Sequence, residues 1–167
     1  LEVEIDDASA SADRDILVAE PVIGTDIFGR DQVKFKFDDM YPGSSAVAVV
    51  KVKNTGTMAV RIDSPIFTWG DGDAGSLTLW DLFSVDDVTF TPSASGDGRP
   101  IALTKHIGID GNAYYTLDES NPVLIEPNEY AVFTINVKMN ESVSGEEDLG
   151  DIWFTFQPTF KQYNDPY

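Results

Sequence analysis

The residue types that carry out most enzyme chemistry are scarce in this chain. Its 167 residues include one histidine, His106, and no cysteine. Thiol catalysis, a zinc–thiolate site, an iron–sulfur cluster and a disulfide framework are therefore excluded. A Ser–His–acid triad would have to use His106, and the sequence lacks the Gly-x-Ser-x-Gly motif that presents a nucleophilic serine in many hydrolases. We expect no catalytic residues and no enzymatic activity.

Oxygen ligands are more plentiful, and they make binding of one metal ion possible. Asp71 and Asp73 lie in a glycine-rich segment with Asp81 nearby, and Asp38-Asp39 forms a second acidic pair. Calcium binds several carboxylate and carbonyl oxygens, so Ca²⁺ is the candidate cofactor and Asp71 and Asp73 are its candidate ligands. Neither cluster matches the twelve-residue EF-hand loop. Aspartate and glycine are also ordinary turn residues, so a loop without metal is the simpler interpretation.

Two further features could involve sugars. Asn140-Glu141-Ser142 is an Asn-x-Ser acceptor in an expected loop, which makes Asn140 a candidate glycosylation site. Aromatic side chains could form a sugar-binding platform, and a secreted carbohydrate-binding module is therefore the alternative function. Packing in the core is the competing explanation, because most of these aromatic residues lie in alternating segments. They are Trp69, Trp80, Trp153, Tyr114, Tyr115 and Phe133.

The charge balance restricts the partners. With 29 acidic and 11 basic residues the formal net charge is -18, and such a field repels nucleic acid and anionic membranes. No apolar stretch approaches the roughly 18 to 20 residues of a membrane span. The sequence starts at Leu1 without an initiator methionine. We therefore expect an extracellular or cell-surface protein whose signal peptide has already been removed.

Apolar and polar residues alternate along most of the chain, which is typical of half-buried β-strands. Val33–Phe37 and Tyr130–Val137 are the clearest cases. Many short strands separated by turn residues predict one all-β antiparallel sandwich. Further strands are expected at residues 16–23, 66–69, 85–91, 101–107, 113–117 and 152–156. Pro21 predicts an edge position for the first of these, and the spacing of Leu79, Leu82 and Phe83 predicts one short helix over Ser76–Phe83.

Residues 45–63 predict a hairpin. The first segment, Ser45–Lys53, has valines of both parities, which is typical of a strand covered on both faces. Asn54-Thr55-Gly56-Thr57 then supplies residues that tolerate the backbone of a tight turn. The following segment, Met58–Ile62, alternates again.

The amino-terminal segment is amphipathic and changes parity once. Leu1, Val3 and Ile5 are apolar, and after Asp6-Asp7 the small residues Ala8, Ala10 and Ala12 continue on the other parity. One extended strand with a bulge near Asp6-Asp7 would put all of these on one face. Such a strand could be the first strand of its own sandwich. It could instead leave its own domain and complete the sheet of a neighbour.

A pattern between Phe37 and Val60 resembles a known family. A short polar turn, Tyr41-Pro42-Gly43, precedes a strand, and Asn54-Thr55-Gly56-Thr57 precedes the next. This arrangement resembles the TasA/camelysin family of secreted biofilm-matrix proteins and the related archaeal bundling pilins. The resemblance implies a jelly-roll sandwich, export with a cleaved signal peptide, and fibres in which a free amino-terminal strand enters the next subunit.

We therefore expect a structural subunit of an extracellular filament, either a biofilm-matrix fibre or a bundling pilus, assembled head to tail by donor-strand complementation. Residues 1–14 would form the donor strand and residues 15–167 a single sandwich domain. The expected acceptor edges are Ile16–Val22 and Ile152–Phe160. Its partners would be other copies of itself, with lateral contacts between filaments, and neither nucleic acid nor a membrane span is expected. The donor side chains would be Leu1, Val3, Ile5, Ala8 and Ala10.

Overall fold

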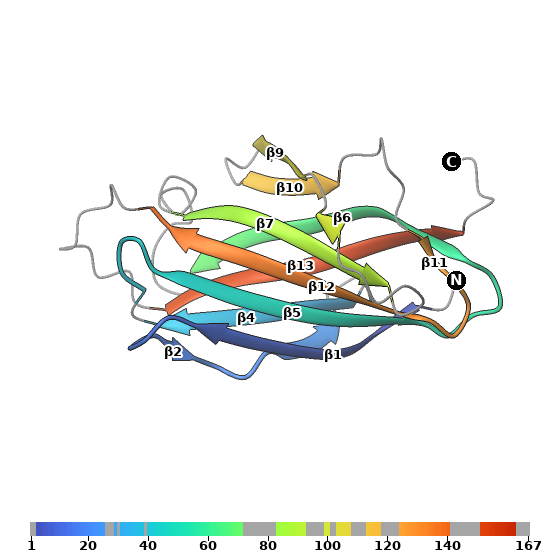
Figure 1. Cartoon of the computed structure of the whole chain (residues 1–167), viewed down its shortest axis with the longest axis horizontal. Coiled ribbons are helices and arrows are strands. Elements are labelled where there is room, and N and C mark those ends of the chain that lie inside the picture. Colours follow the sequence, from blue (N-terminus) through green and yellow to red (C-terminus); the bar gives the residue numbers. More distant parts are fainter. Residues whose placement is uncertain are drawn as a thin grey trace.

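The chain forms two β-sheets, and every pairing between described strands is antiparallel (Figure 1). The computed structural model describes residues 3–25, 29, 31–38, 40–71, 83–92, 99–100, 103–107, 113–117, 124–140 and 151–162, with the backbone alone at some strand positions. Within these ranges every helix or strand element is a strand. The expected all-β antiparallel class is confirmed.

The two sheets contain strands from distant parts of the chain. Sheet A consists, in spatial order, of β1 (Val3–Ala12), β5 (Ser45–Asn54), β12 (Tyr130–Met139), β7 (Phe83–Pro92) and β8 (Arg99–Pro100). Sheet B consists of β2 (Leu17–Val18), β4 (Asp31–Asp38), β13 (Asp151–Gln162), β6 (Val60–Asp71), β10 (Ala113–Leu117) and β9 (Leu103–Ile107). In addition, β3 (Val22–Thr25) pairs with β4, and β11 (Leu124–Ile125) pairs with β6.

The strand order is that of a jelly roll. The series β4-β13-β6-β10 in sheet B faces the series β5-β12-β7-β8 in sheet A. Consecutive strands from β4 to β7 alternate between the sheets, and the late strands β12 and β13 insert between earlier ones, as in double-sheet jelly rolls. Strand β1 lies outside these eight strands, as an extra strand on the free side of β5.

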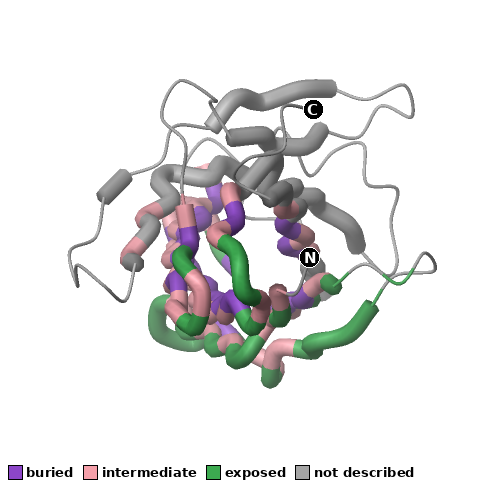
Figure 2. Tube along the Cα trace, turned by 90° about the vertical axis from the view of Figure 1, so that its right-hand side faces the viewer, coloured by how far each residue is buried: buried purple, intermediate pink, exposed green. Residues whose placement is uncertain are grey.

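The core lies between the two sheets (Figure 2). Alternate residues of β4, β5, β12 and β13 point inward, as the period of two requires. Phe154 of β13 stacks on Phe35 and Phe37 of β4, with ring centroids 5.0 and 5.3 Å away. Phe133 of β12 packs on Phe156 across the sandwich at 5.5 Å. The Phe154 contacts tie β13 to β4 within sheet B, and the contact between Phe133 and Phe156 joins the two sheets through their inward faces.

The predicted hairpin over residues 45–63 is wrong. Strands β5 and β6 belong to different sheets, so the chain crosses between the layers after Asn54. The Asn54 side chain is fully buried at this crossing. Its amide donates to the carbonyls of Met58 (2.8 Å) and Ile125 (3.0 Å), and its side-chain oxygen accepts from the N–H of Gly56 (3.0 Å). The Asn-x-Gly motif therefore shapes an arch between sheets, which local turn propensity does not distinguish from a hairpin.

Of the two segments predicted as acceptor edges, one lies at the edge of sheet B, and the other lies partly between two strands. Strands β2 and β3 pair with β4 on its outer side and flank Pro21, so the edge position predicted from Pro21 is confirmed. Strand β13, by contrast, lies between β4 and β6. Ile152–Phe156 is therefore not an edge that could accept another strand, whereas Gln157–Phe160 pairs with β6 alone among the described strands. Pro158, which suggests an edge strand, lies beyond the last pairing with β4, at Phe156, so its missing N–H removes no bond to β4.

The expected helix over Ser76–Phe83 lies outside the described residues, except that Phe83 begins β7. Among the residues that the structure describes, no helix has the length and apolar character needed to span a membrane.

Candidate functional site

The amino-terminal strand pairs inside its own molecule. Strand β1 runs antiparallel to β5, with Val3 opposite Asn54 and Ala12 opposite Ala46. It is the terminal strand of sheet A, and β5 is the only described strand to which it is hydrogen-bonded. It also lies beside β2 and β3 of sheet B, so it helps to close one side of the sandwich (Figure 1). The segment is therefore not detached in this molecule, and completing a neighbour's sheet would require it to leave its own.

The side chains of β1 point as the sequence predicts. Apolar and small residues pack against the core while remaining partly exposed, and the acidic and hydroxyl residues between them are exposed. The inward set consists of Val3, Ile5, Ala8, Ala10 and Ala12. Of the predicted donor residues, only Leu1 lies outside the described residues. A strand that is half-buried on one face and bonded along one side is held less firmly than a central strand, since each hydrogen bond contributes about 1 kcal/mol net.

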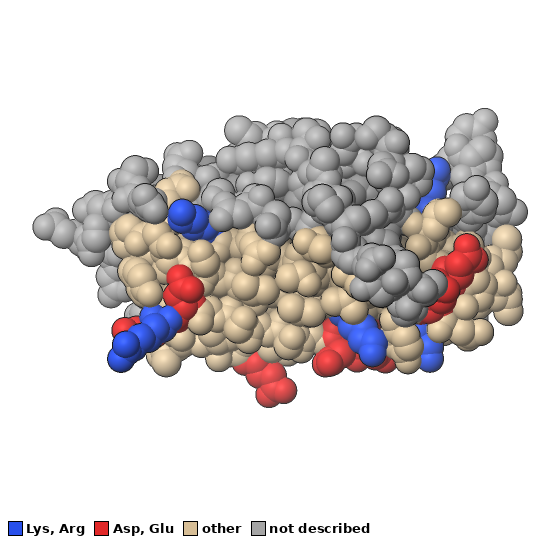
Figure 3. All heavy atoms as spheres, in the orientation of Figure 1, with Lys and Arg blue, Asp and Glu red and all other residues tan. Residues whose placement is uncertain are grey.

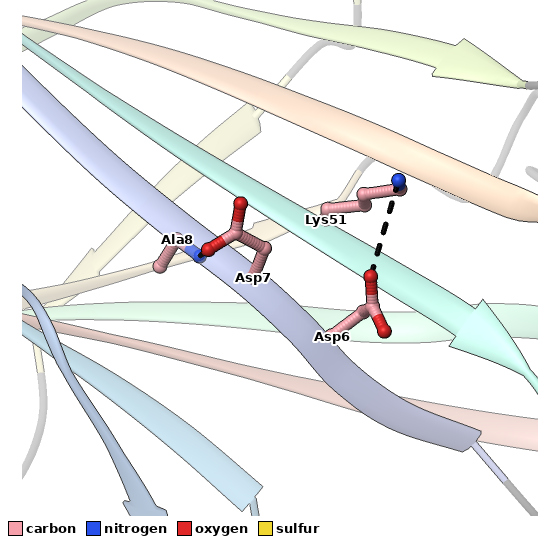
Figure 4. A network of polar contacts seen from close by, with 4 residues as sticks. All are labelled: Asp6, Asp7, Ala8 and Lys51. Atoms are coloured by element: carbon pink, nitrogen blue, oxygen red, sulfur yellow. Dashed lines mark hydrogen bonds and ion pairs between the residues drawn. The ribbon is translucent and has the colours of Figure 1, made fainter.

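A β-bulge at Asp6-Asp7 reconciles the two parities. Ile5 is opposite Val52, and Asp7 is opposite the next residue, Lys51, so Asp6 is the inserted residue. Both carboxylates lie on the outer face, where Asp6 Oδ2 is 3.9 Å from Lys51 Nζ and the Asp7 carboxylate accepts from the N–H of Ala8 at 2.9 Å (Figure 4). The bulge predicted from the sequence is confirmed. It lets Val3 and Ile5 share the inward face with Ala8, Ala10 and Ala12.

Lysine side chains mark the outer face opposite the bulge, and sequence reasoning missed them. Lys51 Nζ lies 4.0 Å from the centre of the Tyr130 ring, and Lys53 Nζ lies 5.2 Å from it. These cation–π contacts hold the ammonium groups of β5 between the acidic strand β1 and Tyr130 of β12. Only the register across β1, β5 and β12 brings these residues together, so no local motif could have indicated them.

The middle of the outer face of sheet A carries no charged side chain among its described residues (Figure 3). Its rows run across three strands, and Val49 of β5 lies between Ser9 of β1 and Thr134 of β12. Val47, two residues away, lies between Ser11 and Asn136 in the same manner. Figure 3 shows acidic and basic groups toward the ends and the lower border of this face. Uncharged residues thus flank β5 on both sides in the middle of this face.

The structure describes only part of the candidate metal, glycosylation and histidine sites. Asp71 is the last residue of β6, and Asp73 lies outside the described residues. Within the described ranges, no group of three or more His, Cys, Asp or Glu side chains is placed to hold a metal ion. Asn140 directly follows β12 and is half-buried. His106 lies in β9.

One aromatic residue of the predicted sugar-binding platform does not lie on the surface. Phe133 is fully buried and packs on Phe156, so it cannot stack on a sugar from outside. Trp69, Trp153, Tyr114 and Tyr115 lie in β6, β13 and β10, with only their backbone described, and Trp80 lies outside the described residues. Core packing, which the strand alternation favoured for these aromatic residues, is thus what the structure shows for Phe133.

Comparison with known proteins identifies no family. No family model matches the chain, and no curated protein matches it. A solved CBM3a-L domain from scaffoldin cipA of the Clostridium thermocellum cellulosome has a TM-score of 0.38 and 12% identity, over 80% of this chain and 89% of that one. AvmM, which catalyses macrocyclization in alchivemycin A biosynthesis, has a TM-score of 0.36 and 13% identity over 75% of each chain. Likenesses this distant carry no argument about function.

Proposed function

We propose that this chain is a non-enzymatic, secreted structural subunit that builds an extracellular filament by passing β1 from one copy to the next. The observation that carries the proposal is the position of β1. It comes first among the described strands, lies outside the eight-stranded jelly roll and has β5 as its only hydrogen-bonded strand partner there. In the single molecule β1 occupies its own β5 edge. In the filament, β1 of a neighbouring copy would occupy the same edge in the same register.

Passing the strand in one direction gives a polymer. Each copy offers one strand and one vacated β5 edge, so a head-to-tail exchange leaves a free strand at one end and a free edge at the other. Two copies that exchange their strands with each other would instead form a closed dimer. The two outcomes differ in size and are distinguished by electron microscopy and light scattering.

The family resemblance supports the same strand as acceptor. The resembling stretch, Phe37 to Val60, includes the whole of β5 and the buried Asn54 that ends it. The Tyr41-Pro42-Gly43 turn leads directly into β5, and the Gly43 N–H donates to the Met139 carbonyl of β12 (2.9 Å). The resembling residues thus include the whole of β5 and the turn that connects it to β12, which supports β5 as the acceptor in this proposal.

Cysteine cross-linking tests the exchange, because the natural chain has no cysteine. Ser9 is directly opposite Val49, and both positions lie on the outer face. In the variant S9C/V49C, oxidation of dilute monomer is expected to give one cross-link within the chain. Oxidation after assembly is expected to give a ladder of covalently linked chains on a non-reducing gel, because the thiol introduced at position 9 then lies on the neighbour's β5.

The matched control keeps the cysteine at position 49 and moves its partner. Thr134 of β12 lies opposite Val49 on the other side of β5, inside the jelly roll. The variant V49C/T134C is therefore expected to cross-link within one chain both before and after assembly. Filaments of S9C/V49C that give only cross-links within single chains would overturn strand exchange as the mode of assembly.

A further inference from the structure

The connection between β1 and β2 is a tight turn that joins the two sheets. Strand β1 ends at Ala12 in sheet A, and β2 begins at Leu17 in sheet B. The Ile16 N–H donates to the Asp13 carbonyl (3.3 Å), and the Tyr41 hydroxyl donates to the Arg14 carbonyl (3.1 Å). Ile16 is buried in the core and anchors the far end of the turn. The chain thus reverses between layers over residues 13–16.

Asp15 holds this turn in a left-handed backbone conformation. Its φ is 72°, a region that residues with a Cβ adopt at a steric cost. Among the described residues other than glycine, only Asn128 shares this property, with φ of 66°. The closed turn between β1 and β2 therefore stores backbone strain at one identified residue.

The contacts around the turn divide into two groups. The Asp13 N–H donates to the Ser45 carbonyl (3.0 Å), and the Ser45 N–H donates to the Asp13 carboxylate (2.8 Å). These two bonds extend the β1–β5 register by one pair. If β1 paired with the β5 of another copy, the same two bonds could form there. The bonds at Ile16 and Arg14 belong to the turn itself and would be lost when the segment extends. The hinge is therefore Arg14-Asp15-Ile16.

We infer that Asp15 is the conformational switch that sets the balance between the closed monomer and the strand-exchanged form. This inference rests on the proposed exchange of β1. When β1 pairs within its own molecule, Asp15 must keep a positive φ; when β1 docks on a neighbour, residues 14–16 extend and that requirement disappears. The monomer stays closed only as long as the contacts of β1 contribute more free energy than the strain of the turn costs.

Two substitutions at this residue act in opposite directions. Proline fixes φ near −65° and cannot adopt the closed turn, so D15P is expected to favour the extended hinge. Glycine adopts positive φ without steric cost, so D15G is expected to favour the closed turn. N128G removes the same type of strain outside the hinge, between β11 and β12, and is the matched control.

The test measures the ratio of cross-links between chains to cross-links within chains, in full-length S9C/V49C at one protein concentration. We expect D15P to raise this ratio about tenfold or more, D15G to lower it about threefold, and N128G to leave it unchanged. A D15P protein that keeps the parent ratio, while the parent forms filaments, overturns the hinge inference and leaves strand exchange standing. A D15P protein that loses its internal cross-link without ever linking chains supports the hinge and overturns strand exchange. An equal response to D15G and N128G also overturns the hinge inference.

Discussion

Deleting Asp6 should leave β1 almost intact, although deletions inside strands are usually damaging. Ile5 and Asp7 already face consecutive residues of β5, Val52 and Lys51. Without Asp6 the strand becomes regular, Val3 and Ile5 keep their inward positions, and no apolar burial is lost. The loss is the contact between Asp6 and Lys51, whose side chains are 37% and 40% exposed. Exposed pairs of this kind contribute about 0.2–1 kcal/mol, so the free energy of unfolding should change by about 1 kcal/mol or less.

Deleting Ser9 is the matched control, because it removes one residue on the same outer face without removing the bulge. If Ala10 and Ala12 keep their register, the residues before the deletion have two possible arrangements. The strand can turn the half-buried Val3 and Ile5 outward, which costs about 2 kcal/mol in lost apolar burial. It can instead lose the bulge and turn the Asp7 carboxylate inward, which costs about 1–3 kcal/mol for a polar group without a partner.

Urea unfolding followed by tryptophan fluorescence measures both deletions, and the variant lacking Ser9 should lose about 2 kcal/mol. Equal losses for the two deletions, or a larger loss without Asp6, would refute the reasoning that the bulge aligns two parities of one strand. The result does not depend on whether the chain assembles, since it concerns the monomer alone.

Three other changes test separate parts of the structure. N54A removes a buried amide and leaves the carbonyls of Met58 and Ile125 without their donor, so urea unfolding should show a loss of about 2–3 kcal/mol; a change below about 0.5 kcal/mol would contradict a structural role for the arch. V3D places a carboxylate on the inward face of β1 and should abolish filaments in electron micrographs while circular dichroism stays native, whereas E4Q on the outer face should assemble normally; normal filaments from V3D would count against the donor role. Because the chain carries a net charge of -18, millimolar calcium or low pH should increase light scattering by assembled filaments, since both reduce repulsion between them; unchanged scattering would exclude charge as the barrier to bundling.

Local alternation was sufficient for the strands and for the bulge. Val33–Phe37 and Tyr130–Val137 lie within β4 and β12, and the parity change at Asp6-Asp7 indicated the one register shift in β1. These features depend on neighbours within two residues, so the sequence carries them directly. The edge position of β2 and β3 followed from Pro21, because proline cannot donate to a second neighbouring strand.

Which strands pair with one another could not be predicted from local alternation. Asn54-Thr55-Gly56-Thr57 has the composition of a hairpin turn, yet the Asn54 amide finds its acceptors in Met58 and Ile125, and the chain changes sheet. Ile152–Phe160 was expected at an edge, yet its first part, up to Phe156, lies between β4 and β6 in sheet B. Its alternation records which face is buried, but not which strands lie beside it. The contacts of Lys51 with Asp6 and Tyr130 likewise depend on a register across three strands.

The order of synthesis adds a consequence to the pairing of residue 3 with residue 54. A growing chain makes β1 first and completes the edge that receives it only about fifty residues later. At about 5–20 residues per second, the segment waits roughly 3–10 s before its own acceptor exists. Throughout that interval its apolar side chains have no place of their own to dock, and crowding of emerging copies would favour a neighbour over the parent molecule. On the proposed exchange of β1, expression level should therefore influence how many chains become linked to another copy, in addition to protein concentration after folding.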